Sequence, residues 1–566
     1  MTTVVQRQQQ VSVANALQAS GVTPLMARLL AARGVADIKQ LSANLSDLLP
    51  PQSLTNNAHM AKLLADAMAA DKALLVIGDY DADGATATAV AVKGLRALGG
   101  RVDFLVPNRF EYGYGLTPEI VALAATKTPD VIITVDNGIA SVEGVAAANA
   151  MGMQVLITDH HLPGPIAPAA ACIINPNQHG CEFASKHLAG VGVIFYALLA
   201  LRAELRERGA YAAKPEPNLT ELLDLVALGT VADLVKLDAN NRILVEQGLR
   251  RIRAGACSLG ILALLRISGR QAHSCNAQDL GFYVGPRLNA AGRLDDMSLG
   301  IRCLLADDDA QASSLAQQLQ DLNAERRNIE ADMQAGAQVG LDKINVADRF
   351  TICMHQADWH QGVIGILASR IKERYHRPVI TFANAGDGLL KGSGRSIAGL
   401  HLRDALDTLS KQQPNLILKF GGHAMAAGLS IRLEDFSVFS AGFEGVVRGL
   451  IGVADLQSVL EVDGSLSAAE MNFATAQLLE NQVWGQGFAP PLFYDEFTVL
   501  SQRLLADKHL KLSLKSTSNP RAPVLDAIYF NHADWFEGPI QVAYQLQTNG
   551  YNGAQKVQLN IRYVAC

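Results

Sequence analysis

Asp79, Asp81 and Asp83 occupy alternate positions of an expected loop, 79–84, directly after an apolar run. Carboxylates this close to one another repel unless cations hold them. A calcium-binding EF-hand has this spacing, but Val90 stands where its closing glutamate belongs, and a strand-like run precedes the loop in place of a helix. A solvated acidic turn is the other explanation that the loop alone allows.

Two further apolar runs end in the same kind of residue. One run leads into Asp136, and the next leads into the triplet Asp159, His160 and His161. Alanine-rich helical patterns lie between the runs, and this alternation predicts a parallel β-sheet. Ligands bind beyond the carboxyl ends of the strands in such sheets, so these side chains should converge on one crevice.

Asp233 is a fourth candidate, although a residue that ends a helical pattern would by itself be unremarkable. Carboxylates and an imidazole with no thiolate nearby favour Mn²⁺ or Mg²⁺ over structural zinc. Aspartates from several loops can bridge two such ions about 3.5 to 4 Å apart, an arrangement that hydrolyses phosphodiesters. The pattern therefore indicates metal-assisted hydrolysis of a phosphate ester.

Four segments resemble, in chain order, the motifs of the DHH phosphoesterase superfamily: 79–84, 136–138, 159–161 and 231–233. The segment 421–428 resembles the signature of the domain that accompanies it. The block 285–293, the length and the C-terminal extension are similar to the RecJ family of bacterial single-strand-specific exonucleases. This resemblance implies an α/β protein with a parallel-sheet DHH catalytic domain, a long connecting helix, a second α/β DHH-associated domain and a C-terminal β-barrel of the OB type.

The expected domains follow from these motifs and from the hydrophobic pattern. They are an N-terminal segment (1–45), the DHH domain (46–240), a helical connector (241–345), the DHH-associated substrate-binding domain (346–452) and the OB-fold single-strand-binding domain (453–566). The stretch 311–333 lacks glycine and proline and predicts a long helix that joins two lobes. Residues from about 455 onward are expected to form a small antiparallel barrel.

The chemistry assigns roles to the acidic cluster. The expected direct metal ligands are Asp81, Asp83, Asp136, His160 and Asp233, with Asp136 bridging the two ions. Asp79 would bind a metal or support a ligand, and Asp159 would orient a histidine. By resemblance to DHH enzymes, His161 would contact the scissile phosphate. Asp136, Asp159, His160 and His161 are thus the expected catalytic residues.

A phosphate grip is expected in the segment 392–396, whose glycines, hydroxyls and arginine suit a phosphate cradle, although a plain turn is the alternative. The RecJ resemblance implies a 5′-phosphate pocket, and the residues carried over to it are Arg109, Arg287, Ser393 and Arg395. His423 is a candidate for a further phosphate contact, and a core histidine is its alternative.

The net charge of −6 is unusual for a protein that binds nucleic acid, but binding depends on local basic patches. Between 503 and 521, five basic residues accompany one acidic residue. Lys511 lies in an alternating apolar and polar run there, which predicts a strand whose outer face binds phosphates or is simply solvated. The aromatic residues of 484–493 either stack bases or pack in a core.

Together these features predict a two-metal exonuclease that degrades single-stranded DNA from its 5′ end to mononucleotides in recombination and repair. The rival hypotheses are a DHH phosphodiesterase of cyclic dinucleotides or very short oligonucleotides and a non-catalytic scaffold. Single-stranded DNA is the expected substrate of a monomer, and the RecJ resemblance alone implies single-strand-binding protein and a RecQ-type helicase as partners. The N-terminus shows no apolar signal segment and no apolar run is long enough to span a bilayer, so we expect a cytoplasmic protein.

Overall fold

The computed structural model describes residues 2–108, 111–113, 115–518, 522–551 and 554–565. The chain divides into two compact units. One unit comprises residues 1–5 and 321–460, and the other comprises residues 6–320 and 461–566. Within the described ranges, no helix has both the length and the apolar character needed to cross a membrane.

A five-stranded parallel sheet forms the centre of the larger unit. Its strands, in spatial order, are β3 (Val102–Leu105), β2 (Leu74–Gly78), β4 (Val131–Val135), β5 (Gln154–Thr158) and β6 (Cys172–Ile174). Every residue of β2 and β4 is buried, because helices cover both faces of the sheet. The parallel sheet expected from the sequence is confirmed.

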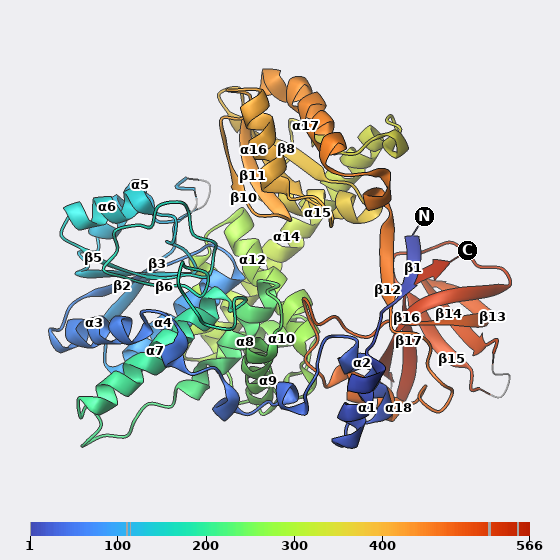
Figure 1. Cartoon of the computed structure of the whole chain (residues 1–566), viewed down its shortest axis with the longest axis horizontal. Helices are drawn as coiled ribbons and strands as arrows, with labels where there is room; N and C mark the ends of the chain where they lie inside the picture. The colour runs from blue at the N-terminus through green and yellow to red at the C-terminus, as the bar shows by residue number, and fades with distance from the viewer. Residues whose placement is uncertain (1, 109–110, 114, 519–521, 552–553, 566) are drawn as a thin grey trace. The chain divides into compact units, whose positions relative to one another are not determined.

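Helices form a layer on each side of this sheet (Figure 1). One layer contains α3 (Asn57–Ala69), α4 (Ala82–Leu98) and α7 (Gly190–Glu207), and the other contains α5 (Pro118–Ala125) and α6 (Val142–Ala150). The acidic loop is shorter than expected, because α4 already begins at Ala82. The side chain of Asp81 caps this helix by accepting a hydrogen bond from the Gly84 amide, so Asp83 lies in the first helical turn.

The rest of this unit up to residue 320 is helical. Two helices, α1 (Val11–Ala19) and α2 (Pro24–Ala31), precede the sheet, and α8 (Leu223–Ala232), α9 (Ala239–Arg253), α10 (Leu259–Ile267), α11 (Ala277–Asp279), α12 (Gly285–Leu294) and α13 (Ser298–Leu305) follow it. A π-helical turn, Leu280–Val284, joins α11 to α12. The long helix expected over 311–333 is confirmed as α14 (Asp309–Leu341), which continues into the other unit.

The C-terminal part of the larger unit is a closed five-stranded barrel. Its strands, in spatial order, are β13 (Phe493–Leu505), β14 (His509–Ser516), β15 (Leu525–Tyr529), β17 (Ala554–Ala565) and β16 (Pro539–Tyr551). The expectation of an antiparallel barrel from about residue 455 was wrong in two details. The barrel starts at Phe493, after α18 (Phe473–Glu480), and β15 pairs with β17 in parallel, which is needed to close five strands into a ring.

The smaller unit contains a mixed sheet with the order β10 (Lys419–Gly422), β11 (Ala426–Arg432), β9 (Leu389–Arg395), β8 (Val379–Gly386) and β7 (Ile352–His355). Its helices are α15 (Ile364–Tyr375), α16 (Leu402–Gln412) and α17 (Phe436–Leu450). The segment 392–396 is no flexible turn, since most of it belongs to the central strand β9. Two short strands, β1 (Thr2–Gln6) and β12 (Ser458–Val462), pair with each other.

Candidate active site

The acidic and histidine side chains meet at the carboxyl edge of the parallel sheet. Asp79 directly follows β2, Asp136 follows β4, and Asp159 follows β5. Asp233 caps the C-terminal end of α8. Parallel strands present their carboxyl ends at one edge, which explains how segments more than 150 residues apart come together.

Three overlapping groups in this cluster have the geometry of a metal site: Asp136 with His160 and His161, Asp83 with His160 and Asp233, and Asp79 with Asp81 and Asp136. In each group, one ligand atom from every residue lies within 4.8 Å of the others. The groups share Asp136 and His160, so they form one continuous cluster. All the residues expected to bind metal are in it.

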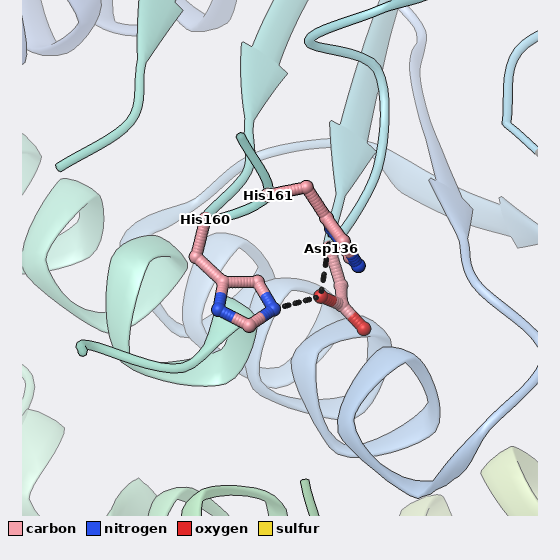
Figure 2. A group of neighbouring side chains, drawn as sticks. All are labelled: Asp136, His160 and His161. Atoms are coloured by element: carbon pink, nitrogen blue, oxygen red, sulfur yellow. Dashed lines mark ion pairs between the residues drawn. The ribbon is translucent and has the colours of Figure 1, made fainter. Parts of the chain in front are cut away.

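His160 lies at the centre of this cluster. Its Nε2 atom is 3.1 Å from Oδ1 of Asp136, 3.5 Å from Oδ2 of Asp233 and 4.0 Å from Oδ2 of Asp83. In Figure 2 dashed lines join one nitrogen of each of the two histidine rings to the Asp136 carboxylate. Nδ1 of His161 is 3.9 Å from Oδ1 of Asp136. A cation at this point would be surrounded by oxygen and nitrogen ligands from four separate segments.

Asp83 is buried, and α7 holds its carboxylate in place. Its two oxygens accept hydrogen bonds from the amides of Gly190 and Val191, at 2.7 and 2.9 Å, in the first turn of α7. These amides have no partner within their own helix, and they carry the positive end of its dipole. The side chain of Asp83 therefore has a fixed orientation before any metal binds.

Asp136 has an unusual backbone and an unsatisfied side chain. Its φ angle is +61°, in the left-handed region that non-glycine residues seldom occupy. Its Oδ1 atom is buried and has no hydrogen bond of good geometry among the described residues, although Nε2 of His160 lies 3.1 Å away. Such strain and such an incompletely satisfied oxygen are typical of functional sites, and a bound cation would satisfy the oxygen.

Asp159 orients His161, the second histidine of the triplet. Oδ1 of Asp159 lies 2.8 Å from Nδ1 of His161 and accepts the amides of both histidines, while Oδ2 accepts the amide of Ile139. This pairing keeps a proton on Nδ1 of His161. The carboxylate expected to orient a histidine thus does so for His161, not for His160.

The charges of the cluster shift several pKa values in the metal-free protein. Burial, followed by the charge of Asp81, raises the pKa of Asp83 to about 7. Burial and the charge of Asp83 also raise the pKa values of Asp136 and Asp233 well above the ordinary range. Carboxylates that hold protons in this way gain most from a divalent cation, so the site fits Mn²⁺ or Mg²⁺.

The Asp159–His161 pair shows the opposite behaviour. Burial would raise the pKa of Asp159, but the charges of the two histidines and the bond to His161 lower it to about 2. Burial would lower the pKa of His161, but Asp159 and the other acidic side chains raise it to about 9. The pair is therefore an aspartate and an imidazolium near neutral pH.

Three supporting residues were missed by the sequence interpretation. Oδ1 of Asn289, on α12, accepts the amide of Ala82 at 2.9 Å and so fixes the start of α4. A Cβ atom on Gly292 would lie 1.8 Å from the carbonyl oxygen of Tyr80. A Cβ atom on Gly190 would lie 2.5 Å from Oδ1 of Asp136. The contacts of α12 and α7 with the acidic segments arise from tertiary packing, which the sequence pattern does not show.

The residues expected to bind DNA are divided among the parts of the chain. Arg109 lies outside the described residues. Arg287, on α12, donates from Nε to Gln320 and from Nη1 to the carbonyl of Tyr283. Lys511 projects from β14, and its Nζ lies 3.9 Å from Oδ2 of Asp526 on β15. The basic strand is therefore partly neutralised by its neighbour.

Ser393, Arg395 and His423 belong to the smaller unit. Nη1 of Arg395 lies 3.2 Å from Oγ of Ser393, and both side chains are on one face of β9. Arg395 pairs with Ala426 of β11, whose carbonyl accepts the amide of His423. His423 is exposed, so the alternative of a core histidine was wrong. These three residues lie at the same end of the β9–β11 ladder.

The aromatic residues of 484–493 pack inside the protein. The rings of Trp484 and Phe488 stack at 5.2 Å, both residues are buried, and Phe493 is fully buried in the barrel. The guanidinium of Arg33 lies over Trp484. This segment is therefore a core element and not a surface for stacking bases.

An acidic and histidine cluster at the carboxyl edge of a parallel sheet, followed by a second α/β unit, defines a metal-dependent phosphoesterase of the DHH class. The family model "DHH family, N-terminal domain" matches residues 73–230, the DHHA1 domain matches residues 347–449, and the RecJ OB domain matches residues 462–563.

Comparison with known proteins narrows this class. The chain is 52% identical over 553 residues to the single-stranded-DNA-specific exonuclease RecJ of Dickeya dadantii, covering 95% of this chain and 96% of that protein. The crystal structure of Thermus thermophilus RecJ in complex with Mn²⁺ matches with a TM-score of 0.83 and 29% identity, over 100% of this chain and 79% of that one. A complex of the same protein with Mg²⁺ matches with a TM-score of 0.77 and 28% identity, over 100% of this chain and 78% of that one. The chain belongs to the RecJ family.

Proposed function

We propose that this protein is a metal-dependent exonuclease that degrades single-stranded DNA from the 5′ end to mononucleotides. The observation that carries the proposal is the cluster around His160, where carboxylates from three separate segments converge on one imidazole nitrogen within 4.0 Å. Membership of the RecJ family supports single-stranded DNA as the substrate, and the Mn²⁺ and Mg²⁺ complexes of the Thermus protein support these two metals.

The proposed metal ligands are Asp79, Asp81, Asp83, Asp136, His160 and Asp233, with Asp136 shared between two ions. When bound, two Mn²⁺ or Mg²⁺ ions supply Lewis-acid activation of water and stabilise the charge on the leaving oxygen. Asp83 is positioned for this by the amides of α7, and Asp136 by its strained backbone. The ligands are thereby held in position before the reaction begins, so no free energy is spent on ordering them during the reaction.

His161 is proposed to bind the scissile phosphate. Its Nδ1 proton is held by Asp159, so the ring presents Nε2 to the substrate. In the metal-free protein Asp159 raises the pKa of His161 to about 9, against the effect of burial. An imidazolium donates a strong, charge-assisted hydrogen bond to a phosphate oxygen and stabilises the negative charge that builds up during the reaction.

The proposed 5′-phosphate grip consists of Ser393, Arg395, Arg287, Arg109 and His423, and Lys511 would contact the strand on the barrel. The 3.2 Å contact between Arg395 and Ser393 supports the grip, because a guanidinium and a hydroxyl on one strand face can share a phosphate. Gripping a terminal phosphate would make the enzyme act at the end of a strand and release mononucleotides.

Product analysis on end-labelled DNA tests the proposal. With Mn²⁺ or Mg²⁺, a 5′-phosphorylated single strand should yield mononucleotides from its 5′ end, while a blunt duplex should stay intact. Asp136→Ala should abolish cleavage but retain DNA binding, and Asp136→Asn, which keeps the shape but loses the charge, should behave in the same way. A wild-type protein that leaves single strands intact with both metals, or an Asp136→Ala variant with near-normal turnover, would contradict the proposal.

The proposed division of the chain is 1–45, 46–240, 241–345, 346–452 and 453–566, as the motifs predict. We also propose single-strand-binding protein and a RecQ-type helicase as partners of a monomeric enzyme. Stimulation of DNA degradation by either purified partner checks this proposal, and sedimentation of the enzyme alone checks its oligomeric state.

A further inference from the structure

Two asparagines follow β6 at the edge of the sheet where the metal cluster lies. β6 ends at Ile174, and the loop 175–177 directly after it contains both of them, Asn175 and Asn177. β6 pairs in parallel with β5, so the carboxyl ends of the two strands lie side by side. The loop after β6 therefore borders the segment 159–161, which follows β5.

Each asparagine donates its side-chain amide to the backbone of one histidine. Nδ2 of Asn177 donates to the carbonyl oxygen of His160 at 2.6 Å. Nδ2 of Asn175 donates to the carbonyl oxygen of His161 at 2.9 Å. The amides of both histidines donate to Oδ1 of Asp159. The backbone of the two histidines is thus held at its amides by one strand end and at its carbonyls by the next.

This support matters because the two imidazole rings face the same carboxylate. In an extended strand, consecutive side chains point to opposite faces. Here Nε2 of His160 and Nδ1 of His161 lie 3.1 and 3.9 Å from the same oxygen of Asp136 (Figure 2). The two histidines belong to no strand or helix, so no regular ladder fixes their backbone. Hydrogen bonds from side chains take the place of that ladder.

The loop that carries the asparagines is itself well anchored. Asn175 is fully buried, and its Oδ1 accepts the amide of Asn177 at 2.7 Å, which closes an Asx turn. Pro176, between them, has a restricted φ angle. Nζ of Lys186 donates to the carbonyl oxygens of Pro176 and Cys181, at 2.8 and 2.6 Å. Both amide donors therefore have a defined position before any metal binds.

We propose that Asn175 and Asn177 are positioning residues that aim the two adjacent histidine rings at their separate targets. Asparagines that bond a backbone carbonyl are common in loops, where they stabilise a turn. These two bonds differ because they end on consecutive residues with different tasks. Asn177 holds His160, a proposed metal ligand, and Asn175 holds His161, the proposed phosphate contact.

This inference rests on the proposed function and deepens it, since it names what keeps the histidines of that site in place. Loss of the Asn177 amide frees the carbonyl of His160. The ring of His160 is then no longer held beside Asp136, and metal affinity falls. The proposed 5′-phosphate grip lies on other segments, so the affinity for the end of the strand should stay the same.

The test measures Mn²⁺ binding to the metal-free full chain by calorimetry, and hydrogen–deuterium exchange of the segment 159–161 in EDTA. Asn177→Ala and Asn177→Leu should raise the Kd for Mn²⁺ roughly 10- to 100-fold, and the segment should exchange faster. Asn177→Gln keeps a donor amide and should recover most of both. At saturating Mn²⁺, the KM of Asn177→Ala for a 5′-phosphorylated oligonucleotide should change less than about twofold, so the loss lies in metal binding and kcat.

A matched control separates this role from a general loss of stability. Asn149→Ala removes the same kind of bond, from Nδ2 to the carbonyl of Ala169 at 2.9 Å, in the same compact unit. It should leave Mn²⁺ affinity and exchange at 159–161 unchanged. Asn175→Ala removes a fully buried side chain and should also lower the thermal unfolding midpoint, so the partly exposed Asn177 carries the test.

Three results would overturn the inference: wild-type Mn²⁺ affinity in Asn177→Ala, equal losses in Asn177→Ala and Asn177→Gln, or an equal loss in Asn149→Ala. A wild-type protein that binds no Mn²⁺, or that binds it and leaves single strands intact, would instead refute the proposed function.

Discussion

Gly190 and Asp136 are in direct contact through the bare backbone of the glycine. A Cβ atom on Gly190 would lie 2.5 Å from Oδ1 and 2.6 Å from Cβ of Asp136. The same glycine donates its amide to Asp83. One position at the start of α7 thus sets the place of two carboxylates of the proposed metal site.

Gly190→Ala should displace Asp136 or the first turn of α7, and either shift disturbs the ligand geometry. We expect a loss of roughly 10- to 100-fold in Mn²⁺ affinity and in kcat/KM, the usual cost of disturbing the support of a metal ligand. Calorimetric metal titration and the nuclease assay measure the two effects. Gly445→Ala is the matched control, because a Cβ atom there meets nothing within 4 Å. Equal behaviour of the two variants would contradict this prediction.

The metal-free protein should lose stability as the pH rises from about 4 to about 9. The pKa of Asp83 is raised from 3.8 to about 7, so its stabilising contribution is present below pH 3.8 and is lost as the pH rises through 7. The pKa of His161 is raised from 6.5 to about 9, so its contribution is lost as the pH rises through 9. The pKa of Asp159 is lowered from 3.8 to about 2, so its stabilising contribution is lost only as the pH falls below about 4 towards 2.

Thermal unfolding in EDTA and in Mn²⁺ across this pH range measures the effect. The unfolding midpoint in EDTA should fall with rising pH, and Mn²⁺ should restore more of it at pH 8 than at pH 5, since the cation replaces protons on the carboxylates. Asp83→Asn should reduce the slope in EDTA. A metal-free midpoint that rises steadily between pH 5 and 8 would be incompatible with this prediction.

Asn289→Ala should destabilise the protein by about 1–3 kcal/mol, because it leaves the buried amide of Ala82 without an acceptor. The first turn of α4, which carries Asp83, should then also bind metal less well. Chemical unfolding and metal titration check both effects. Asn289→Asp keeps an acceptor oxygen and should recover most of the unfolding free energy, so equal losses in the two variants would exclude the hydrogen bond as the cause.

Arg33 and Asp463 form a buried, two-pronged ion pair with N–O distances of 2.9 and 2.8 Å. Arg33→Ala leaves the Asp463 charge buried and uncompensated, so we expect a loss of about 3–5 kcal/mol in the free energy of unfolding. Arg266→Ala is the control, because its pair with Asp309 is exposed and should be worth no more than about 1 kcal/mol. Urea unfolding measures both, and similar losses would contradict the prediction.

This pair also affects how the barrel should be tested. A truncation near residue 450 removes Asp463 and leaves Arg33 without its partner, so lost activity could reflect lost stability. Lys511→Ala in the full chain avoids this problem, because Lys511 lies on the outer face of β14. Reduced affinity for long single strands with unchanged stability is the expected result.

Local sequence patterns were enough to predict which segments of the chain contribute residues to the site. Each apolar run of β2, β4 and β5 is followed at once by its polar residues, and strand-helix alternation permits only a parallel sheet whose carboxyl ends share an edge. Asp136 and His160 were therefore predicted from the strand ends, and Asp233 was predicted from the end of a helical pattern. The sequence pattern gave the wrong secondary structure at 392–396, where the glycines suggested a turn. Gly392 and Gly394 are in fact in a strand. These two positions are glycine because the side chains of Phe382 and Leu402 occupy the space that their Cβ atoms would need.

The sequence by itself determined which residues end the strands, since that depends on short continuous apolar runs and on the polar residues that directly follow them. The tertiary structure alone decided which distant residues support them: Asn289 for the start of α4, Gly190 for Asp136, and the π-helical turn Leu280–Val284 for the end of α8. These contacts join segments about 50 to 200 residues apart. They depend on how helices pack across the sheet edge, and no local pattern of residue types records that packing.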